Sequence, residues 1–319
     1  MASWRVDEPI RVSVCCITYK QEQYIVQAVD SFLMQKTTFP FEIIIGEDCG
    51  GDGTLTILAE YQKRYPNLIK VITSENNVGA NANILRVFNA AKGDYIAICE
   101  GDDYWVDEVK LQKQYDNLIL EKNINICFTA SQKLASNGTI NRYAYHNKHK
   151  KIFEFSSVVR GGGGFMPTAS IMVKSEIVNK MPDWFVSAPI GDFYIQILGA
   201  LGYGALYLPD VTCVYRLNAV GSWTNSKFKD SSSKIINDAK IHDRCIRKLE
   251  QLSDCRYNND YNYAIAMFYY GAASLLTKNK DYQHACEMIK LSWGIYKMMS
   301  FKQIILYLFK NNLFFIRGH

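Results

Sequence analysis

The most informative carboxylates of this sequence follow an apolar stretch of strand length. The run from Tyr95 to Cys99 leads directly into Glu100, Asp102 and Asp103. Carboxylates crowded at the end of a buried strand repel each other unless a cation lies between them. Oxygen ligands without His or Cys favour magnesium or manganese, and such an ion commonly bridges to substrate phosphates. The pattern predicts a diphosphate-bearing ligand, whereas an isolated Asp pair is typical of a solvated turn.

Two other strand-like runs also end in polar residues. The first ends in Thr18-Tyr19-Lys20-Gln21-Glu22, and the second ends in Glu47-Asp48 and continues into a glycine-rich turn. The first run lacks the glycines of a GxGxxG turn, and GxxxxGK[ST] occurs nowhere, so a dehydrogenase or a P-loop enzyme is disfavoured. Asp48 would stand at the edge of a cleft, where a carboxylate accepts a hydrogen bond from a base N–H. The alternative for this segment is a plain turn.

Apolar runs and helical periodicity alternate four times between residues 10 and 121. Strands that are apolar throughout, each followed by a helix, predict an α/β fold with a mostly parallel sheet covered by helices on both faces. Ligands of such sheets bind beyond the carboxyl ends of the strands. We expect a domain over residues 1–229, with a nucleotide-binding half at 1–122 and an acceptor-side half at 123–229. Residues 230–319 are expected to form a helical C-terminal region.

Composition narrows the class of protein. The 319 residues are 48% hydrophobic and 21% charged, which excludes a disordered chain. The net charge of +5 arises from residues 288–319, which contain five Lys or Arg and no acid, so nucleic acid is not the expected partner. Nine cysteines form no CxxC pair and are expected to be reduced. The N-terminus has no signal-peptide core, so we expect a cytoplasmic location.

Five motifs in the first 120 residues together resemble the nucleotide-binding half of bacterial family 2 glycosyltransferases, which have the GT-A fold. They are TYKQEQYIVQAVDSFLMQ, EDCGGDGT, NNVGANAN, AAKGDYIAICEGDDYW and KLQKQ, in family order. The resemblance implies a nucleoside-diphosphate sugar donor, a UDP- or GDP-sugar, with Mn²⁺ or Mg²⁺ as cofactor. It also implies inversion at the anomeric carbon by single displacement.

Residue roles carried over by position concern the donor and the metal. Thr18, Tyr19 and Glu22 would line the nucleoside pocket, and Asp48 would meet the base. Asp102 would hold the ribose or a metal-bound water, and Asp103 would ligate the metal. Lys20 stands where many members have Asn, and Glu100 where the motif often starts with Asp, so the ligand stays open between Glu100, Asp102 and Asp103.

The acceptor hydroxyl requires a base, and a carboxylate across the cleft is the simplest one. Asp192 resembles the second acidic motif of the family and is our candidate, although an N-cap of the following helix is the alternative. Asp183 and Asp210 are the fallback bases.

The segment Tyr215-Arg216-Leu217-Asn218, followed by Trp223, resembles the closing segment of the family, in which Arg216 would neutralise the diphosphate and Trp223 would stack on a sugar ring. A surface salt bridge and a core tryptophan are the alternatives. Asn218 stands where some members have a metal-binding His.

The acceptor is expected to be a glycan or a lipid-linked sugar, in surface polysaccharide synthesis. Phe165, Thr168, Ser170 and Trp223 are the candidate acceptor contacts. The tail from Ser300 mixes apolar residues with spaced cations, which allows either packing on the protein or a partner, or peripheral contact with the inner face of the membrane. A non-catalytic nucleotide-sugar binding module and a sugar-nucleotide nucleotidyltransferase are the alternative functions.

Overall fold

The computed structural model describes residues 4, 8–219, 230–253 and 255–312. The chain divides into two compact units, Met1–Asp183 with Gly191–Ser222, and Trp184–Ile190 with Trp223–His319. The domain limits expected at residues 122 and 229 stay predictions.

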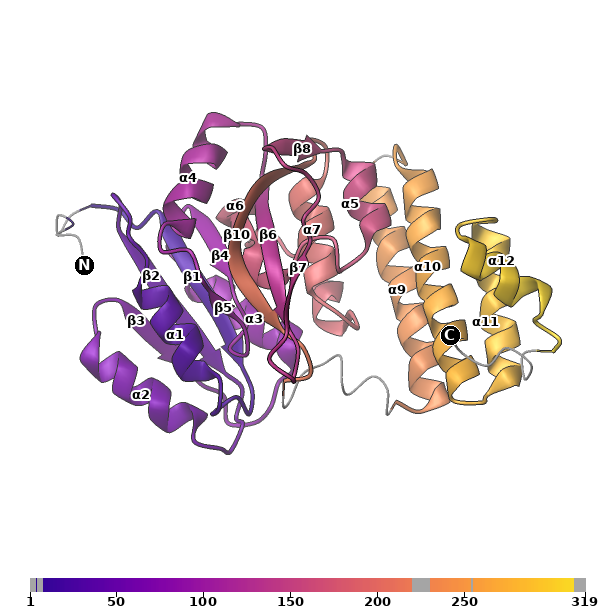
Figure 1. The fold of residues 1–319 in the computed structure, drawn as a ribbon, viewed down its shortest axis with the longest axis horizontal. Helices are drawn as coiled ribbons and strands as arrows, with labels where there is room; N and C mark the ends of the chain where they lie inside the picture. The colour runs from indigo at the N-terminus through magenta and orange to yellow at the C-terminus, as the bar shows by residue number, and fades with distance from the viewer. Residues whose placement is uncertain (1–3, 5–7, 220–229, 254, 313–319) are drawn as a thin grey trace. The chain divides into compact units, whose positions relative to one another are not determined.

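The first unit is built on one sheet with the strand order β3-β2-β1-β4-β9-β6-β10-β5, to which β7 adds beside β6 and β8 beside β10 (Figure 1). From β3 to β4 all pairs are parallel, and antiparallel pairs enter with β9. The strands are β1 (Val12–Thr18), β2 (Phe41–Glu47), β3 (Ile69–Ile72), β4 (Tyr95–Ile98), β5 (Tyr104–Trp105), β6 (Ile126–Leu134), β7 (Ile140–Tyr143), β8 (Lys151–Phe153), β9 (Met172–Lys174) and β10 (Ala205–Arg216).

Helices cover both faces of this sheet. On one face α1, α2 and α4 share a single apolar cluster with alternate residues of β1 and β2, and on the other face α3 contacts β1, β2 and α6 (Figure 1). Strands buried on both faces must be apolar throughout, which explains why β1 reads VSVCCIT. The helical elements of the unit are α1 (Ile25–Leu33), α2 (Thr54–Arg64), α3 (Ala80–Ala90), α4 (Lys110–Leu120), α5 (Phe155–Gly161), η1 (Thr168–Ser170), α6 (Ser175–Val178) and α7 (Asp192–Ala200).

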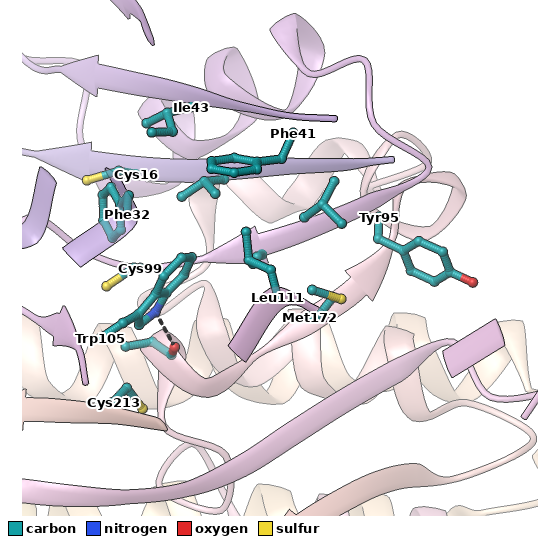
Figure 2. Close-up of a cluster of buried hydrophobic side chains, with 14 of the residues drawn as sticks. Cys16, Phe32, Phe41, Ile43, Tyr95, Cys99, Trp105, Leu111, Met172 and Cys213 are labelled. Atoms are coloured by element: carbon teal, nitrogen blue, oxygen red, sulfur yellow. Dashed lines mark hydrogen bonds between the residues drawn. The ribbon is translucent and has the colours of Figure 1, made fainter. Parts of the chain in front are cut away.

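The apolar cluster anchors the segment that follows the acidic motif. The ring of Trp105 lies 4.8 Å from that of Phe32 on α1, and its Nε1–H donates to the carbonyl of Ala169 at 2.9 Å (Figure 2). Trp105 is 2% exposed. The chain just after Asp103 is therefore tied both to α1 and to the η1 segment that carries Thr168.

The second unit is helical over its described residues, as the periodicity after residue 230 predicts. Its elements are η2 (Asp183–Ser187, which begins at the last residue of the first unit's segment), α9 (Ser232–Leu252), α10 (Asn258–Lys278), α11 (Tyr282–Ile295) and α12 (Phe301–Leu308). Ser231, Asp281 and Ser300 cap the N-termini of α9, α11 and α12 by accepting hydrogen bonds from backbone N–H groups. In the described part of the chain, no helix is long and apolar enough to cross a membrane.

Candidate active site

The carboxyl ends of β1, β2 and β4 meet at one edge of the sheet. Thr18 pairs in register with Glu47, the Asp48 N–H donates to the Thr18 carbonyl at 3.0 Å, and the Gly101 N–H donates to the Ile17 carbonyl at 3.0 Å. The three loops that carry the sequence motifs therefore converge, as parallel pairing requires.

The loop after β1 and the loop after β2 are joined by carboxylates. Glu22 accepts from the Gly53 N–H at 3.0 Å, and the Glu22 N–H donates to Asp52 at 3.1 Å. Beside them lies a cavity of about 360 Å³, lined by Lys20, Glu22, Gln23, Tyr24, Gly50, Gly51 and Asp52. Among the described residues that line it, Glu22 is the one that the sequence motifs predicted as a donor contact.

Lys20 and Cys49 both have a φ of 56°, in the left-handed region. This conformation is costly for most side chains and is tolerated best by Gly and Asn. Asn at position 20 would therefore adopt this backbone conformation at a lower cost than Lys20 does.

Asp48 is buried and fully engaged by protein groups. Its carboxylate accepts from the backbone N–H groups of Val78 and Gly79 at 2.8 and 2.9 Å, and from the Ser74 hydroxyl at 3.1 Å. These bonds fix the NNVGANAN segment beside the end of β2. Asp48 lies at the end of β2, as the sequence predicts. A ligand bound at the Asp48 carboxylate would also contact the NNVGANAN segment that this carboxylate holds.

Glu100, Asp102 and Asp103 form a compact turn after β4. Burial raises the pKa of all three, and the neighbouring carboxylates contribute to the shifts of Glu100 and Asp103; the pKa of Glu100 reaches about 8. The charges that act on Glu100 are those of Asp102 and Asp192. The turn is therefore a buried acidic cluster in which the surrounding positive charge does not offset the cost of ionising all three carboxylates.

Arg216, at the end of β10, supplies the positive charge beside these acids. Its backbone N–H donates to Asp103 Oδ1 at 2.8 Å, and its Nε–H donates to the Asp102 carbonyl at 2.9 Å. The guanidinium lies over the rings of Tyr24 and Tyr104, at 4.8 and 5.4 Å from the ring centres. The structure thus brings Arg216 together with Asp102 and Asp103, from which it is separated by more than a hundred positions.

Two polar atoms beside the acidic turn are buried without a hydrogen-bond partner among the described residues, Thr18 Oγ1 and Gln21 Oε1. A Cβ placed on Gly101 would come within 2.5 Å of Gln21 Oε1 and 2.9 Å of Thr18 Oγ1. Buried polar groups normally have partners. These two atoms are the hydrogen-bonding capacity that the described residues leave unused beside the acidic turn.

Asp192 is the first residue of α7 and accepts from its own neighbour, the Phe193 N–H, at 2.6 Å. Its charge acts on the pKa values of Glu100 and Tyr143, so its carboxylate belongs to the same electrostatic environment. One turn later Gln196 donates to the carbonyls of Gly163 and Met166, which ties the glycine run to α7. The helix therefore positions both the candidate base and the acceptor-side segment.

The fallback bases lie elsewhere. Asp210 pairs with Lys113 at 2.9 Å in the irregular part of β10, six positions before Arg216. Asp183 is exposed at the start of η2. Neither is brought to the acidic turn in the described structure.

The acceptor candidates have mixed placements. The ring of Phe165 packs at 4.4 Å from His146 and 5.5 Å from Phe128, and Thr168 is partly exposed at the start of η1. Ser170 is buried and donates to the Pro167 carbonyl at 2.6 Å, which is a structural contact. Trp223 lies outside the described residues.

The sequence motifs did not assign a role to Tyr143 and Gln21 beside the site, or to Lys110 in the interior. Tyr143 comes from β7 and lies close enough to Asp192 and Asp103 for both to act on its pKa. Lys110 is fully buried beside Trp105. The KLQKQ motif was a signal for Lys110, but nothing local in the sequence marks Tyr143.

The chemistry of the acidic turn fits a divalent cation. Carboxylate oxygens whose pKa values are raised by burial and by one another suit Mg²⁺ or Mn²⁺. In the described ranges, no group of three or more His, Cys, Asp and Glu forms a cage for an ion. Mg²⁺ commonly uses one or two protein carboxylates together with substrate phosphates, so the residues present fit such an ion.

Comparison with known proteins gives a family and a fold. Residues 13–181 match the model of glycosyl transferase family 2, well beyond the first 120 residues on which the sequence motifs depended. The uncharacterized protein Rv1520 of Mycobacterium tuberculosis is 33% identical over 219 residues, which cover 66% of this chain and 60% of that protein. The chain therefore spans less than two thirds of the length of this relative.

Two solved structures share the fold. The crystal structure of S. aureus TarS 1-349 in complex with UDP has a TM-score of 0.55 at 16% identity, covering 96% of this chain and 91% of that one. The mannosyltransferase PcManGT from Pyrobaculum calidifontis, in complex with GDP-Man and Mn2+, has a TM-score of 0.56 at 15% identity, covering 97% and 86%. The expected α/β architecture of the GT-A type is confirmed.

Proposed function

This chain belongs to glycosyl transferase family 2, and we propose that it catalyses metal-dependent, inverting transfer of a sugar from a nucleoside diphosphate to an acceptor hydroxyl. The observation that carries the proposal is the acidic turn Glu100 to Asp103, which faces Arg216 and shares its electrostatic environment with Asp192. The UDP and GDP-Man in the two structural neighbours support a UDP- or GDP-sugar as donor.

The donor would lie over the acidic turn. Asp103 and Asp102 would hold Mg²⁺ or Mn²⁺, which when bound acts as a Lewis acid toward the leaving diphosphate. Arg216 would pair with the same phosphates. Thr18 Oγ1 and Gln21 Oε1 would gain the partners that they lack in the protein alone, and Tyr19, Glu22 and Asp48 would border the nucleoside.

The reaction would need one proton transfer from the acceptor. Asp192 would take the proton of the acceptor hydroxyl. At the same time the acceptor oxygen would form a bond to the anomeric carbon, and the bond between that carbon and the phosphate oxygen would break. Attack opposite the leaving group inverts the anomeric centre. Gln196 and the glycine run at 161–164 would orient the acceptor beside Thr168 and Phe165.

The test is turnover of a panel of UDP- and GDP-sugars with Mn²⁺, measured as release of nucleoside diphosphate. We expect Asp192→Asn to lower turnover by about 10² to 10⁴ while the donor-induced thermal shift is kept. Asp183→Asn and Asp210→Asn are the matched controls, since they remove the two rival bases. Full turnover in Asp192→Asn would refute the assignment of the base.

The same assay separates the alternative functions. A binding module would show the donor-induced thermal shift without turnover in the unsubstituted protein. A nucleotidyltransferase would release inorganic pyrophosphate from a nucleoside triphosphate and a sugar phosphate. Release of nucleoside diphosphate alone supports the transferase.

We further propose that α12 contacts the inner face of a membrane, near the lipid-linked or polymeric acceptor of surface polysaccharide synthesis. One face of α12 packs within the second unit, where Tyr307 stacks on Trp293 at 4.3 Å and Gln303 donates to Ser292. The other face leaves Phe301 and Leu308 75% and 67% exposed. Residues 313–319 lie outside the described residues.

Flotation on anionic vesicles tests this contact. We expect Phe301→Ser/Leu308→Ser to float less than the unsubstituted protein, because apolar area on an interfacial helix drives binding. Leu252→Ser/Leu291→Ser removes exposed leucines from α9 and α11 and is the control. Equal flotation of all three proteins would refute the contact.

A further inference from the structure

We call residues 140–153 the basic strap. This segment runs along one side of the sheet, away from the candidate active site. The strap begins as β7 beside the carboxyl end of β6, crosses over, and ends as β8 beside the start of β10 (Figure 1). His146 packs the middle of the strap onto the sheet. Its ring lies 5.7 Å from Phe128 of β6 and 5.6 Å from Tyr207 of β10, which pair in register, and its Nε2 is 2.8 Å from the Phe165 carbonyl.

The strap and its surroundings carry positive charge that the protein does not neutralise. From residue 122 to residue 153 the sequence has six Lys or Arg and no Asp or Glu. Within the strap, Lys150 pairs with Glu121 at 2.9 Å. Arg142, Lys148 and Lys151 are exposed, and neither they nor Lys133 have a carboxylate within ion-pair distance in the described part of the chain.

Aromatic rings accompany three of these cations. Lys133 lies 3.6 Å from the ring centre of Tyr143, Arg142 lies 5.0 Å from that of Tyr145, and Lys151 lies 4.8 Å from that of Phe153. Tyr145 is 39% exposed. Aromatic faces stack on sugar rings and cations pair with phosphate or carboxylate, so the exposed Tyr145 ring and the cations around it suit a chain that contains both.

The strap begins on the side of the sheet where we propose that the acceptor meets the base. The Tyr143 hydroxyl donates to the Gly164 carbonyl at 3.0 Å. The preceding Gly163 carbonyl accepts from Gln196 of α7, the helix that begins at Asp192. Lys133 is held over the Tyr143 ring at the end of β6. A polymer lying along the strap would therefore have one end beside Asp192.

We propose that the basic strap binds the acceptor, and that this acceptor is an anionic glycan with phosphate or carboxylate groups along its chain. The inference rests on the proposed transferase function and names its acceptor class. A lipid surface fits less well, because the exposed apolar residues Ile140 and Ile152 lie at opposite ends of the strap and form no continuous patch.

Direct binding without donor tests the proposal. The probes are poly(glycerol phosphate), polygalacturonate and neutral dextran of matched length, together with phosphatidylglycerol vesicles. We expect one or both polyanions to bind, with affinity that falls between about 50 and about 500 mM sodium chloride, and dextran not to bind. Binding of one polyanion alone identifies the anion and supports the proposal.

Variants locate the binding on the strap. We expect Arg142→Gln/Lys148→Gln/Lys151→Gln to bind the polyanion about tenfold more weakly, because the variant loses three exposed ion pairs with the polyanion. Arg142→Lys/Lys148→Arg/Lys151→Arg keeps the charge and should retain binding. Lys63→Gln/Lys70→Gln/Lys92→Gln removes the same charge from exposed positions elsewhere in the first unit and is the control.

Three results would overturn the proposal: equal binding of dextran, equal loss in the control variant, or vesicle binding without polyanion binding. Donor turnover is measured separately on the same protein. Polyanion binding without turnover would reject the transferase function and leave the strap as a glycan-binding surface, whereas turnover without polyanion binding would reject the strap alone.

Discussion

The backbone N–H of Arg216 donates a hydrogen bond of 2.8 Å to Oδ1 of Asp103, a residue 113 positions earlier in the chain. Because the backbone makes this bond, the acidic turn is held by β10 whatever side chain stands at position 216. The guanidinium is left to bind the Asp102 carbonyl, Gln27 and, in our proposal, the donor phosphates.

Replacement of Arg216 by Gln should therefore weaken donor binding without unfolding the site. We expect KM for the donor to rise about tenfold or more, because a charge-assisted contact to phosphate is lost. Arg216→Lys should recover only part of the affinity, since the planar fork is lost. Arg247→Gln, which breaks the ion pair with Asp243 in α9, is the control. An unchanged donor KM in Arg216→Gln would contradict the assignment.

Asp103→Asn should remove the response to divalent metal. We expect turnover to fall by about 10² or more, since one ligand of the ion that stabilises the leaving diphosphate is lost. The readout is activity as a function of Mn²⁺ concentration. Asp210→Asn breaks a partly exposed ion pair with Lys113 and should change activity and stability little. A normal response to Mn²⁺ in Asp103→Asn would show that Asp103 is not the metal ligand and would assign that role to Glu100 or Asp102.

Stabilisation by Mg²⁺ should grow with pH. The pKa of Glu100 is raised to about 8, above its value in the unfolded chain. The folded protein therefore binds more protons than the unfolded chain between about pH 4.5 and 8, and the free energy of unfolding of the metal-free protein falls as the pH rises through this range. A cation binds the deprotonated acids without displacing protons at the upper end of this range. We expect a larger Mg²⁺-induced rise in Tm at pH 8 than at pH 6, and an equal rise would contradict the pKa shift. In Asp103→Asn the difference should shrink.

Lys110 should make the unfolding free energy depend on pH in the opposite direction. Its Nζ lies 4.5 Å from the Trp105 ring centre and donates to Gln114, and burial lowers its pKa to about 8. Asp107 and the thiols of Cys99, Cys127 and Cys213 are the titratable groups around it. Because the unfolded chain holds this proton up to a pH of about 10.4, the cost of burying Lys110 is full below pH 8 and is relieved between pH 8 and 10.4.

Comparison with Lys110→Met isolates this effect from the other titrating groups. Between pH 7 and pH 10, the free energy of unfolding in urea should rise by about 2 to 3 kcal/mol more for the unsubstituted protein than for Lys110→Met. Lys63→Met, at an exposed position, should show no such shift. A difference independent of pH would mean that Lys110 is charged in the folded protein at pH 7 without cost.

Gly101→Ala should damage the site more than the fold. The added Cβ would lie 2.5 Å from Gln21 Oε1 and 2.9 Å from Thr18, so the acidic turn must shift. We expect turnover to fall about tenfold or more, because the positions of Asp102 and Asp103 depend on this turn. Gly271→Ala, on an exposed face of α10 with no atom within 4 Å of the new Cβ, should stabilise by about 0.5 to 1 kcal/mol at full activity. Full activity in Gly101→Ala would contradict the close approach.

The order of residues is enough to assign the strands and helices of the nucleotide-binding half and the edge of the sheet at which the site lies. Runs such as VSVCCIT are apolar at nearly every position because both faces of the sheet are covered, and parallel strands place their carboxyl ends together. Strand and helix patterns of this kind are local. Thr18, Asp48 and the Glu100 to Asp103 turn can therefore be assigned to one edge of the sheet from the order of residues alone.

The residues that complete the site from distant parts of the chain can be identified only in the folded protein. Tyr143 bonds to the glycine run at Gly164 because β7 adds antiparallel beside β6, and Arg216 holds Asp103 because β10 pairs with both β5 and β6. Such pairings join segments that the chain separates by tens of positions, and no periodicity within either segment records them. The sequence shows that residues 122–153 are basic, but only the strand pairings of β7 with β6 and of β8 with β10 show where this segment runs on the sheet.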